Sequence, residues 1–218
     1  MASKKYHQKY YFTVDGETEQ WYFDWLQNQI NAEPVSKYTV TLDCAIQDPK
    51  KRAKSLVITK KTIITHICDY ESNDDVHTAH FQTVLDRMKE SRALGKQIDY
   101  KLGYSNFTFE LWIALHKIDC CGCLDHRKQY LAPINRGFSE NFRSLDEYKR
   151  ESNFKRVLEQ LSLEHVKIAI NRSENIMKSN EDNGLTIIEY KGYKYYRENP
   201  SLSIWEVVKQ ILTDCQLV

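Results

Sequence analysis

The sequence has 218 residues, a length that suggests one domain, or one domain with an insertion. Hydrophobic residues make up 41% and charged residues 28%, a balance typical of a globular and not a disordered chain. Lysine and arginine total 31 against 30 acidic residues, so the net charge of +1 excludes a protein coated in positive charge. Any surface for nucleic acid must therefore be a local patch. No stretch approaches the roughly 18 apolar residues that a membrane span needs, and we expect a cytoplasmic protein with reduced cysteines.

The first half of the chain alternates strand-like and helical patterns. The strand-like runs are residues 7–15, 37–46, 63–69 and 98–104, and the helical patterns are residues 17–30, 50–61, 73–95 and 107–116. This order predicts an α/β fold for residues 1–117, with a small, mostly parallel sheet of about four strands covered by helices. In such a sheet, sites form at the carboxyl ends of the strands.

The second half predicts an extension on this core. Residues 118–143 show no clear periodicity and are expected to form a loop, whereas residues 144–179 predict two helices. Residues 185–196 are rich in tyrosine and predict a β-hairpin with Gly192 at its tip, and a final helix follows Pro200. We expect residues 118–218 to form a helical and hairpin extension that packs on the core as part of one structural unit.

Acidic residues follow the first and third predicted strands. Asp15, Glu17 and Glu19 lie where the first strand becomes a helix, and Asp69 and Glu71 follow the third strand. Grouped carboxylates repel one another unless something positive binds, and oxygen ligands suit Mg²⁺ or Mn²⁺. Such an ion can stabilise the charge that develops on a phosphoryl group. The alternative is that these acids only interact favourably with helix dipoles.

A second candidate metal site lies after the fourth helical pattern. His116, Cys120, Cys123 and His126 fall within eleven residues, and the two cysteines have the C-x2-C spacing of structural zinc sites. Because one short loop would supply all four ligands, the set is sterically tight. The alternative is a loop with reduced thiols.

Basic residues gather in two regions that could contact phosphates. One includes Lys50, Lys51 and Arg52, and the other, in the second half of the chain, includes Lys149. The tyrosines of residues 190–196 could stack unpaired bases, which gives RNA a slight preference over DNA. Solvated charges and a hairpin stabilised by tyrosine pairs are the alternatives. Because the chain has no Gly-rich phosphate loop, we do not expect it to hydrolyse ATP itself.

Several segments resemble the RloB-like protein family. Residues 15–23, DGETEQWYF, are similar to the family's EGxTE-x-x-YF signature, and residues 105–116, SNFTFELWIALH, resemble its SNPxFExWxxLH segment. The run Glu147-Tyr148-Lys149 and residues 199–205 also resemble the family, so the similarity covers nearly the whole chain.

The resemblance implies a Toprim-like fold and metal-dependent cleavage of RNA, tRNA or DNA as the effector of an anti-phage defence system. It also implies an ATPase partner subunit. In this interpretation Asp69 and Glu71 hold Mg²⁺, and Asp15 or Glu17 completes the site or acts as general acid or base. Glu19 is a further candidate catalytic acid.

Glu110 lies among apolar residues of the SNFTFELWIALH segment. A carboxylate on an apolar helix is costly to bury unless it is paired. The resemblance favours a functional or structural pair, with Lys149 or Arg150 as the partner. The alternative is that Glu110 faces water.

Two acids depart from the family pattern. Asp15 stands where the pattern has Glu, and Asp69-Tyr70-Glu71 stands where it has D-x-D. Each change keeps a carboxylate but alters its reach by one methylene, and catalysis tolerates misplacement poorly. A non-catalytic regulatory subunit that binds nucleic acid or the ATPase is therefore the alternative function.

Overall fold

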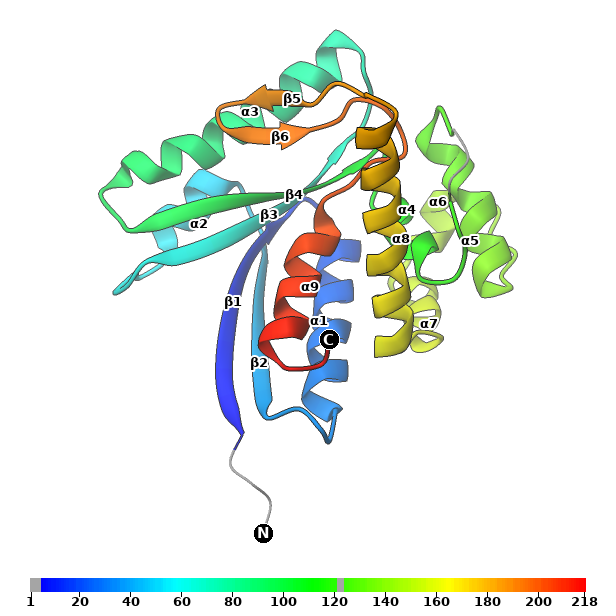
Figure 1. Ribbon diagram of the computed structural model, residues 1–218, viewed down its shortest axis with the longest axis horizontal. Helices are drawn as coiled ribbons and strands as arrows, with labels where there is room; N and C mark the ends of the chain where they lie inside the picture. The colour runs from blue at the N-terminus through cyan, green and yellow to red at the C-terminus, as the bar shows by residue number, and fades with distance from the viewer. Residues whose placement is uncertain (1–4, 121–123) are drawn as a thin grey trace.

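The computed structural model describes residues 5–120 and 124–218 and is built around one parallel sheet (Figure 1). The sheet has the strand order β2–β1–β3–β4, and all of its neighbours run parallel. The strands are β1 (Tyr6–Val14), β2 (Tyr38–Ile46), β3 (Thr62–Tyr70) and β4 (Ile98–Asn106). The predicted α/β class and the four-stranded parallel sheet are therefore confirmed.

Helices cover both faces of the sheet, because the strands bury alternate residues on opposite sides. Phe12 and Val14 of β1 pack against α1 (Glu17–Ala32) on one face. On the other face, Ile64 and Cys68 of β3 pack against α2 (Pro49–Ser55) and α3 (Asp75–Glu90). A 3-10 turn, η1 (Ser91–Leu94), follows α3.

Most helices of the second half lie on the α1 face (Figure 1). The short helix α4, which comes after β4 in the chain, precedes them on the same face. The hydrophobic core on this face contains residues from both halves of the chain, such as Phe12, Tyr148 and Ile211. The helices are α4 (Glu110–Leu115), η2 (Arg127–Tyr130), α5 (Leu131–Phe138), α6 (Leu145–Tyr148), α7 (Glu151–Glu159), α8 (Leu163–Asp182) and α9 (Ile204–Asp214).

The expectation of a loop for residues 118–143 is wrong, because η2 and α5 lie within it. In α5, Ile134 and Phe138 are four residues apart and both are buried. Pro133 and Gly137, which both disfavour a helix interior, made this helix difficult to predict from the sequence. Pro133 is tolerated because it lies in the first turn, where its missing N–H has no partner within the helix.

The predicted hairpin is formed by β5 (Ile188–Tyr190) and β6 (Tyr193–Tyr195), and it lies over α3 (Figure 1). Lys191 and Gly192 form its tip, so the predicted place of Gly192 is confirmed. Both residues have positive φ. The ring of Tyr195 packs 5.0 Å from that of Phe81, and Tyr193, Tyr195 and Tyr196 are buried. The expectation that these three tyrosines stack bases is therefore wrong, because they are core residues.

Within residues 5–120 and 124–218, no helix combines the length and the hydrophobicity needed to cross a membrane.

Candidate active site

Glu19 lies at the carboxyl end of β1, in the first turn of α1. Its side chain turns back over Gly16, so that a Cβ on Gly16 would lie 2.9 Å from Oε2 of Glu19. The hydroxyl of Thr18 donates a hydrogen bond of 2.9 Å to the same oxygen. Glu19 is only 6% exposed, so the DGETE segment buries a carboxylate beside the end of the strand.

Asp69 lies near the end of β3, opposite Ser105 of β4 in the sheet register. The buried hydroxyl of Ser105 donates a hydrogen bond of 2.9 Å to Oδ1 of Asp69. The next residue, Asn106, donates to the carbonyl oxygens of Arg197 and Glu198 and so holds the chain that leaves the hairpin. The Ser-Asn pair of the SNFTFELWIALH segment therefore holds the Asp69 side chain and also the backbone of Arg197 and Glu198.

Glu110 begins α4, and none of its side chain is exposed to solvent. Oε1 of Glu110 lies 3.2 Å from Nζ of Lys149, and the hydroxyl of Thr108 donates a hydrogen bond to Oε2. The predicted pair of Glu110 with a lysine after α6 is confirmed. It joins the first half of the chain to the second at the site.

The charges of Glu19, Asp69, Glu110 and Lys149 influence one another, and we call these residues the acid cluster. Burial and the nearby charges of Glu19 and Glu110 raise the pKa of Asp69 well above its usual value. Burial, followed by the charge of Glu110, also raises the pKa of Glu19. Burial lowers the pKa of Lys149, but the three carboxylates outweigh this effect and leave it raised. One ammonium thus interacts with three carboxylates, of which Glu19 and Glu110 are buried and Asp69 is partly buried.

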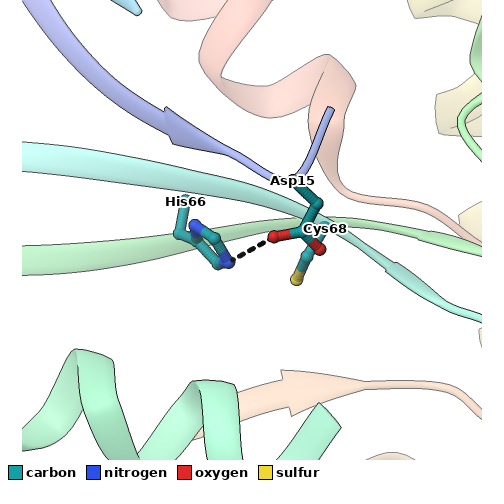
Figure 2. Close-up of side chains that lie close together, drawn as sticks. All are labelled: Asp15, His66 and Cys68. Carbon is teal, nitrogen blue, oxygen red and sulfur yellow. Dashed lines mark ion pairs between the residues drawn. The ribbon is translucent and has the colours of Figure 1, made fainter. Parts of the chain in front are cut away.

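Asp15 follows β1 directly, and its side chain is half exposed. Burial and the charges of Glu19 and Glu71 raise its pKa from 3.8 to about 7. Figure 2 shows Asp15 facing His66 of β3, with 3.6 Å between Oδ1 and Nε2, and Cys68 beside them. Cys68 packs with the α3 face, whereas Asp69, the next residue along the strand, lies among the acids of the cluster.

Glu71 and Glu17 lie at the surface of this edge. Oε2 of Glu71 lies 3.4 Å from Arg127 and 3.5 Å from Nε2 of His77. Glu17 is exposed in the first turn of α1. The structure thus groups Asp69 with Glu19 and Glu110, and it engages Glu71 in surface ion pairs.

Sequence reasoning missed Ser105 as a partner of Asp69, and it missed His66 and Cys68 as neighbours of Asp15. A signal existed for Ser105, since it lies in the segment that resembles the family. No local signal existed for the other two, because their proximity to Asp15 depends on β1 and β3 being neighbours.

His116 of the predicted zinc set belongs to the core. Its Nδ1 lies 2.9 Å from the carbonyl oxygen of Trp112, and its Nε2 lies 3.1 Å from the hydroxyl of Tyr22. Both nitrogens are therefore engaged, which leaves His116 without one for zinc. His126 is exposed and caps η2, Cys120 is buried, and Cys123 lies outside the described residues.

The basic residues of α2 are partly used inside the fold. Arg52 pairs with Asp43, and Nζ of Lys50 lies 2.6 Å from Oε2 of Glu90. Lys51 contributes its backbone N–H to the cap formed by Asp48. A role of Lys50, Lys51 and Arg52 in binding nucleic acid stays a prediction, whereas Lys149 lies in the acid cluster itself.

Comparison with known proteins gives one result at the level of the family. No curated protein and no solved structure matches the chain significantly. The family model described as RloB-like protein matches residues 10–211, and this span includes every residue of the acid cluster. The chain therefore belongs to the RloB-like protein family.

Proposed function

We propose that this protein is a metal-dependent nuclease that cleaves phosphodiester bonds as the effector of an anti-phage defence system. The observation that carries the proposal is the acid cluster at the carboxyl ends of β1 and β3, where Lys149 contacts Glu110 and also interacts electrostatically with Glu19 and Asp69. Placing two buried carboxylates and a third, partly buried one close together is costly, so a protein with no use for them would be expected to replace them. Membership of the RloB-like family supports the same proposal.

The donor set of the cluster fits a hard divalent cation. Mg²⁺ and Mn²⁺ prefer oxygen ligands, and one or two carboxylates with water and substrate phosphate suffice to hold Mg²⁺. Oε1 of Glu110 is buried, and among the described residues it accepts no hydrogen bond and has only the ion pair with Lys149. Glu19 and Asp69 would hold the cation, which, when bound, polarises a phosphoryl oxygen.

The chain's own residues would supply substrate binding and proton transfer. Lys149 is 38% exposed, so its ammonium can reach a phosphate while it remains beside Glu110. Arg127 lies at the same edge, paired with Glu71. While its carboxylate binds no cation, Asp15, with its pKa raised to about 7, can hold or release a proton near neutral pH, as a general acid or base requires.

Direct assay of cleavage tests the proposal. The purified protein is incubated with labelled tRNA, single-stranded RNA and duplex DNA in the presence of Mg²⁺, Mn²⁺ or EDTA. We expect cleavage that requires metal and that Asp69→Asn abolishes. Asp75→Asn is the matched control, because Asp75 is an exposed acid in the first turn of α3, near the same edge of the sheet. Which of these substrates is cleaved decides between RNA and DNA. The buried tyrosines of the hairpin do not favour either one.

The same assay, repeated with an ATPase partner, decides between the two candidate functions. A nuclease that needs its partner gives cleavage only in the mixture, and this cleavage is again lost in Asp69→Asn. If neither preparation cleaves, a regulatory subunit that binds nucleic acid or the ATPase becomes the better interpretation. The surface ion pairs of Glu71, where the family pattern has Asp, favour that alternative.

A further inference from the structure

A second group of potential ligands lies on the α3 side of the sheet, apart from the acid cluster. His66 and Cys68 are two residues apart on β3, so their side chains point to the same face. Asp15 joins them because Val14, the last residue of the neighbouring strand β1, pairs with Ile67. The carboxylate, the imidazole and the thiol each offer one ligand atom, and these atoms all lie within 4.8 Å of one another.

The orientation of His66 suits a ligand. The side chain is 1% exposed, and its Nδ1 lies 2.8 Å from the hydroxyl of Thr13. Its Nε2 is buried, faces Asp15, and finds no hydrogen-bond partner among the described residues. Metal-bound histidines typically engage one ring nitrogen with an oxygen nearby and present the other to the ion. Here Thr13 engages Nδ1, and Nε2 is left facing Asp15, as Figure 2 shows.

The same geometry argues against a proton relay that would activate Cys68. In a catalytic triad the acid orients one ring nitrogen, and the other nitrogen accepts the proton of the nucleophile. Here Thr13 engages Nδ1, while Asp15 faces Nε2, where the thiol of a triad would have to lie. Burial also raises the pKa of Cys68 well above its usual value, so the thiol is not activated.

We propose that Asp15, His66 and Cys68 bind a zinc-class divalent cation through three protein ligands, with the fourth position open on the exposed side of Asp15. Zinc takes carboxylate oxygen, imidazole nitrogen and thiolate sulfur at about 2.0–2.3 Å in tetrahedral geometry, so two ligands on one ion lie about 3.3–3.7 Å apart. The 3.6 Å between Oδ1 and Nε2 is close to this spacing, and the thiol lies within 4.8 Å of both atoms, so a small inward movement of the three side chains would complete the site.

The ligand set separates this site from a magnesium site. A thiol and an imidazole are poor ligands for Mg²⁺ but suit Zn²⁺ and Co²⁺. The aspartate and the thiolate together would balance the two positive charges of the ion. Because the thiol must lose its proton for this to occur, binding releases protons and weakens at low pH.

Titration with Co²⁺ alone tests the proposal, because a cobalt–thiolate bond gives a near-ultraviolet charge-transfer band that carboxylate sites lack. The full chain is stripped with EDTA, dialysed and titrated, and Zn²⁺ is then added. We expect a band that saturates with one equivalent of Co²⁺ and disappears when Zn²⁺ displaces it. Cys68→Ala should abolish the band. Cys44→Ala, which removes a thiol from β2 outside the site, should keep it.

Two further variants keep the result interpretable. Asp15→Asn changes a half-exposed residue, so the chain should remain folded, as circular dichroism can check. We expect it to weaken Co²⁺ binding at least about tenfold, since loss of even an outer partner of a ligand costs that much. A band that survives in Cys68→Ala but vanishes in the double variant Cys120→Ala/Cys123→Ala would overturn the proposal. A folded wild-type chain that shows no band would overturn it as well.

Discussion

A glycine is needed at position 16 because the side chain of Glu19 occupies the space where a Cβ would lie, and not because of the backbone conformation. Its φ of −147° and ψ of 174° are open to any residue. The constraint comes from Glu19, whose Oε2 would lie 2.9 Å from a Cβ at this position. The glycine of the DGETE segment thus leaves room for the carboxylate to fold back over the end of β1.

We expect Gly16→Ala to reduce metal-dependent cleavage by roughly 10- to 100-fold, because a displacement of about 1 Å at a catalytic group has this effect. Kinetic assay at saturating metal measures it. Gly137→Ala is the control, since its Cβ would come 3.1 Å from Cβ of Lys117, in a different part of the fold. Equal losses in both variants would show that the contact with Glu19 is not responsible.

Asp15 should make the folded chain sensitive to pH. Folding raises its pKa from 3.8 to about 7, so the folded state favours the protonated acid. Its contribution to the free energy of unfolding is therefore fully present below about pH 4 and is lost as the pH rises to 7. Because half of the side chain is exposed, solvent screening reduces the loss to about 1 kcal/mol.

Asp15→Asn removes this titration. Urea unfolding in EDTA, at intervals between pH 4 and pH 8, should show the variant gaining stability relative to the wild type as the pH rises to about 7. His66, whose pKa burial lowers to about 4, titrates in the same range but is present in both proteins. A relative stability that falls with rising pH would contradict the assignment.

The ion pair between the start of α4 and the end of α6 joins two helices that are distant in sequence. Glu110 is fully buried, whereas Lys149 is partly exposed. Removing one partner of a buried pair leaves an uncompensated charge, which typically costs about 3–5 kcal/mol. We expect Lys149→Met to cost about 2 kcal/mol of unfolding free energy, because water reaches the lysine side of the pair.

Adding Glu110→Gln to Lys149→Met should restore part of this loss, since the charge in direct contact with Lys149 then disappears while Glu19 and Asp69 remain. Urea unfolding of both single variants and the double variant measures the coupling. Lys155→Met is the control, because Lys155 and Glu151 form an exposed pair along α7 that contributes about 0.3–0.5 kcal/mol. If Lys149→Met costs no more than this control, the pair with Glu110 does not stabilise the fold.

The sheet and part of the site follow from local patterns in the sequence. Alternating strands and helices predict the parallel sheet, and the acids after the first and third strands lie at its carboxyl edge, as Glu19 and Asp69 do. The partner of Glu110 was predicted from the resemblance to the family, which left Lys149 and Arg150 open, and the structure selects Lys149.

The rest depends on contacts that local patterns do not encode. The order β2–β1–β3–β4 brings Asp15 to His66 and Cys68, and no pattern within any one strand specifies that order. In α5, Pro133 and Gly137 conceal the helix that its buried residues form. The tyrosines of the hairpin could be assigned to core or surface only once the hairpin was placed over α3.

One hydrophobic core unites the two halves of the chain. Residues of β1 and α1 pack with residues of α7, α8 and α9 in a single cluster. The ring of Trp21 lies 5.9 Å from that of Phe154, across the expected boundary at residue 117. A chain whose halves share their buried surface should unfold as a unit.

We therefore expect urea unfolding to give one transition, with the same midpoint by far-ultraviolet circular dichroism and by tryptophan fluorescence. The four tryptophans, Trp21, Trp25, Trp112 and Trp205, report on both halves. A fragment of residues 1–117 should lack a cooperative transition, because it exposes the face that Tyr148, Phe154 and Ile211 cover in the full chain. Two separate transitions in the full chain, or a fragment that unfolds cooperatively, would show that the first half is an independent domain. In that case Lys149 would belong to a separate domain docked against the acids.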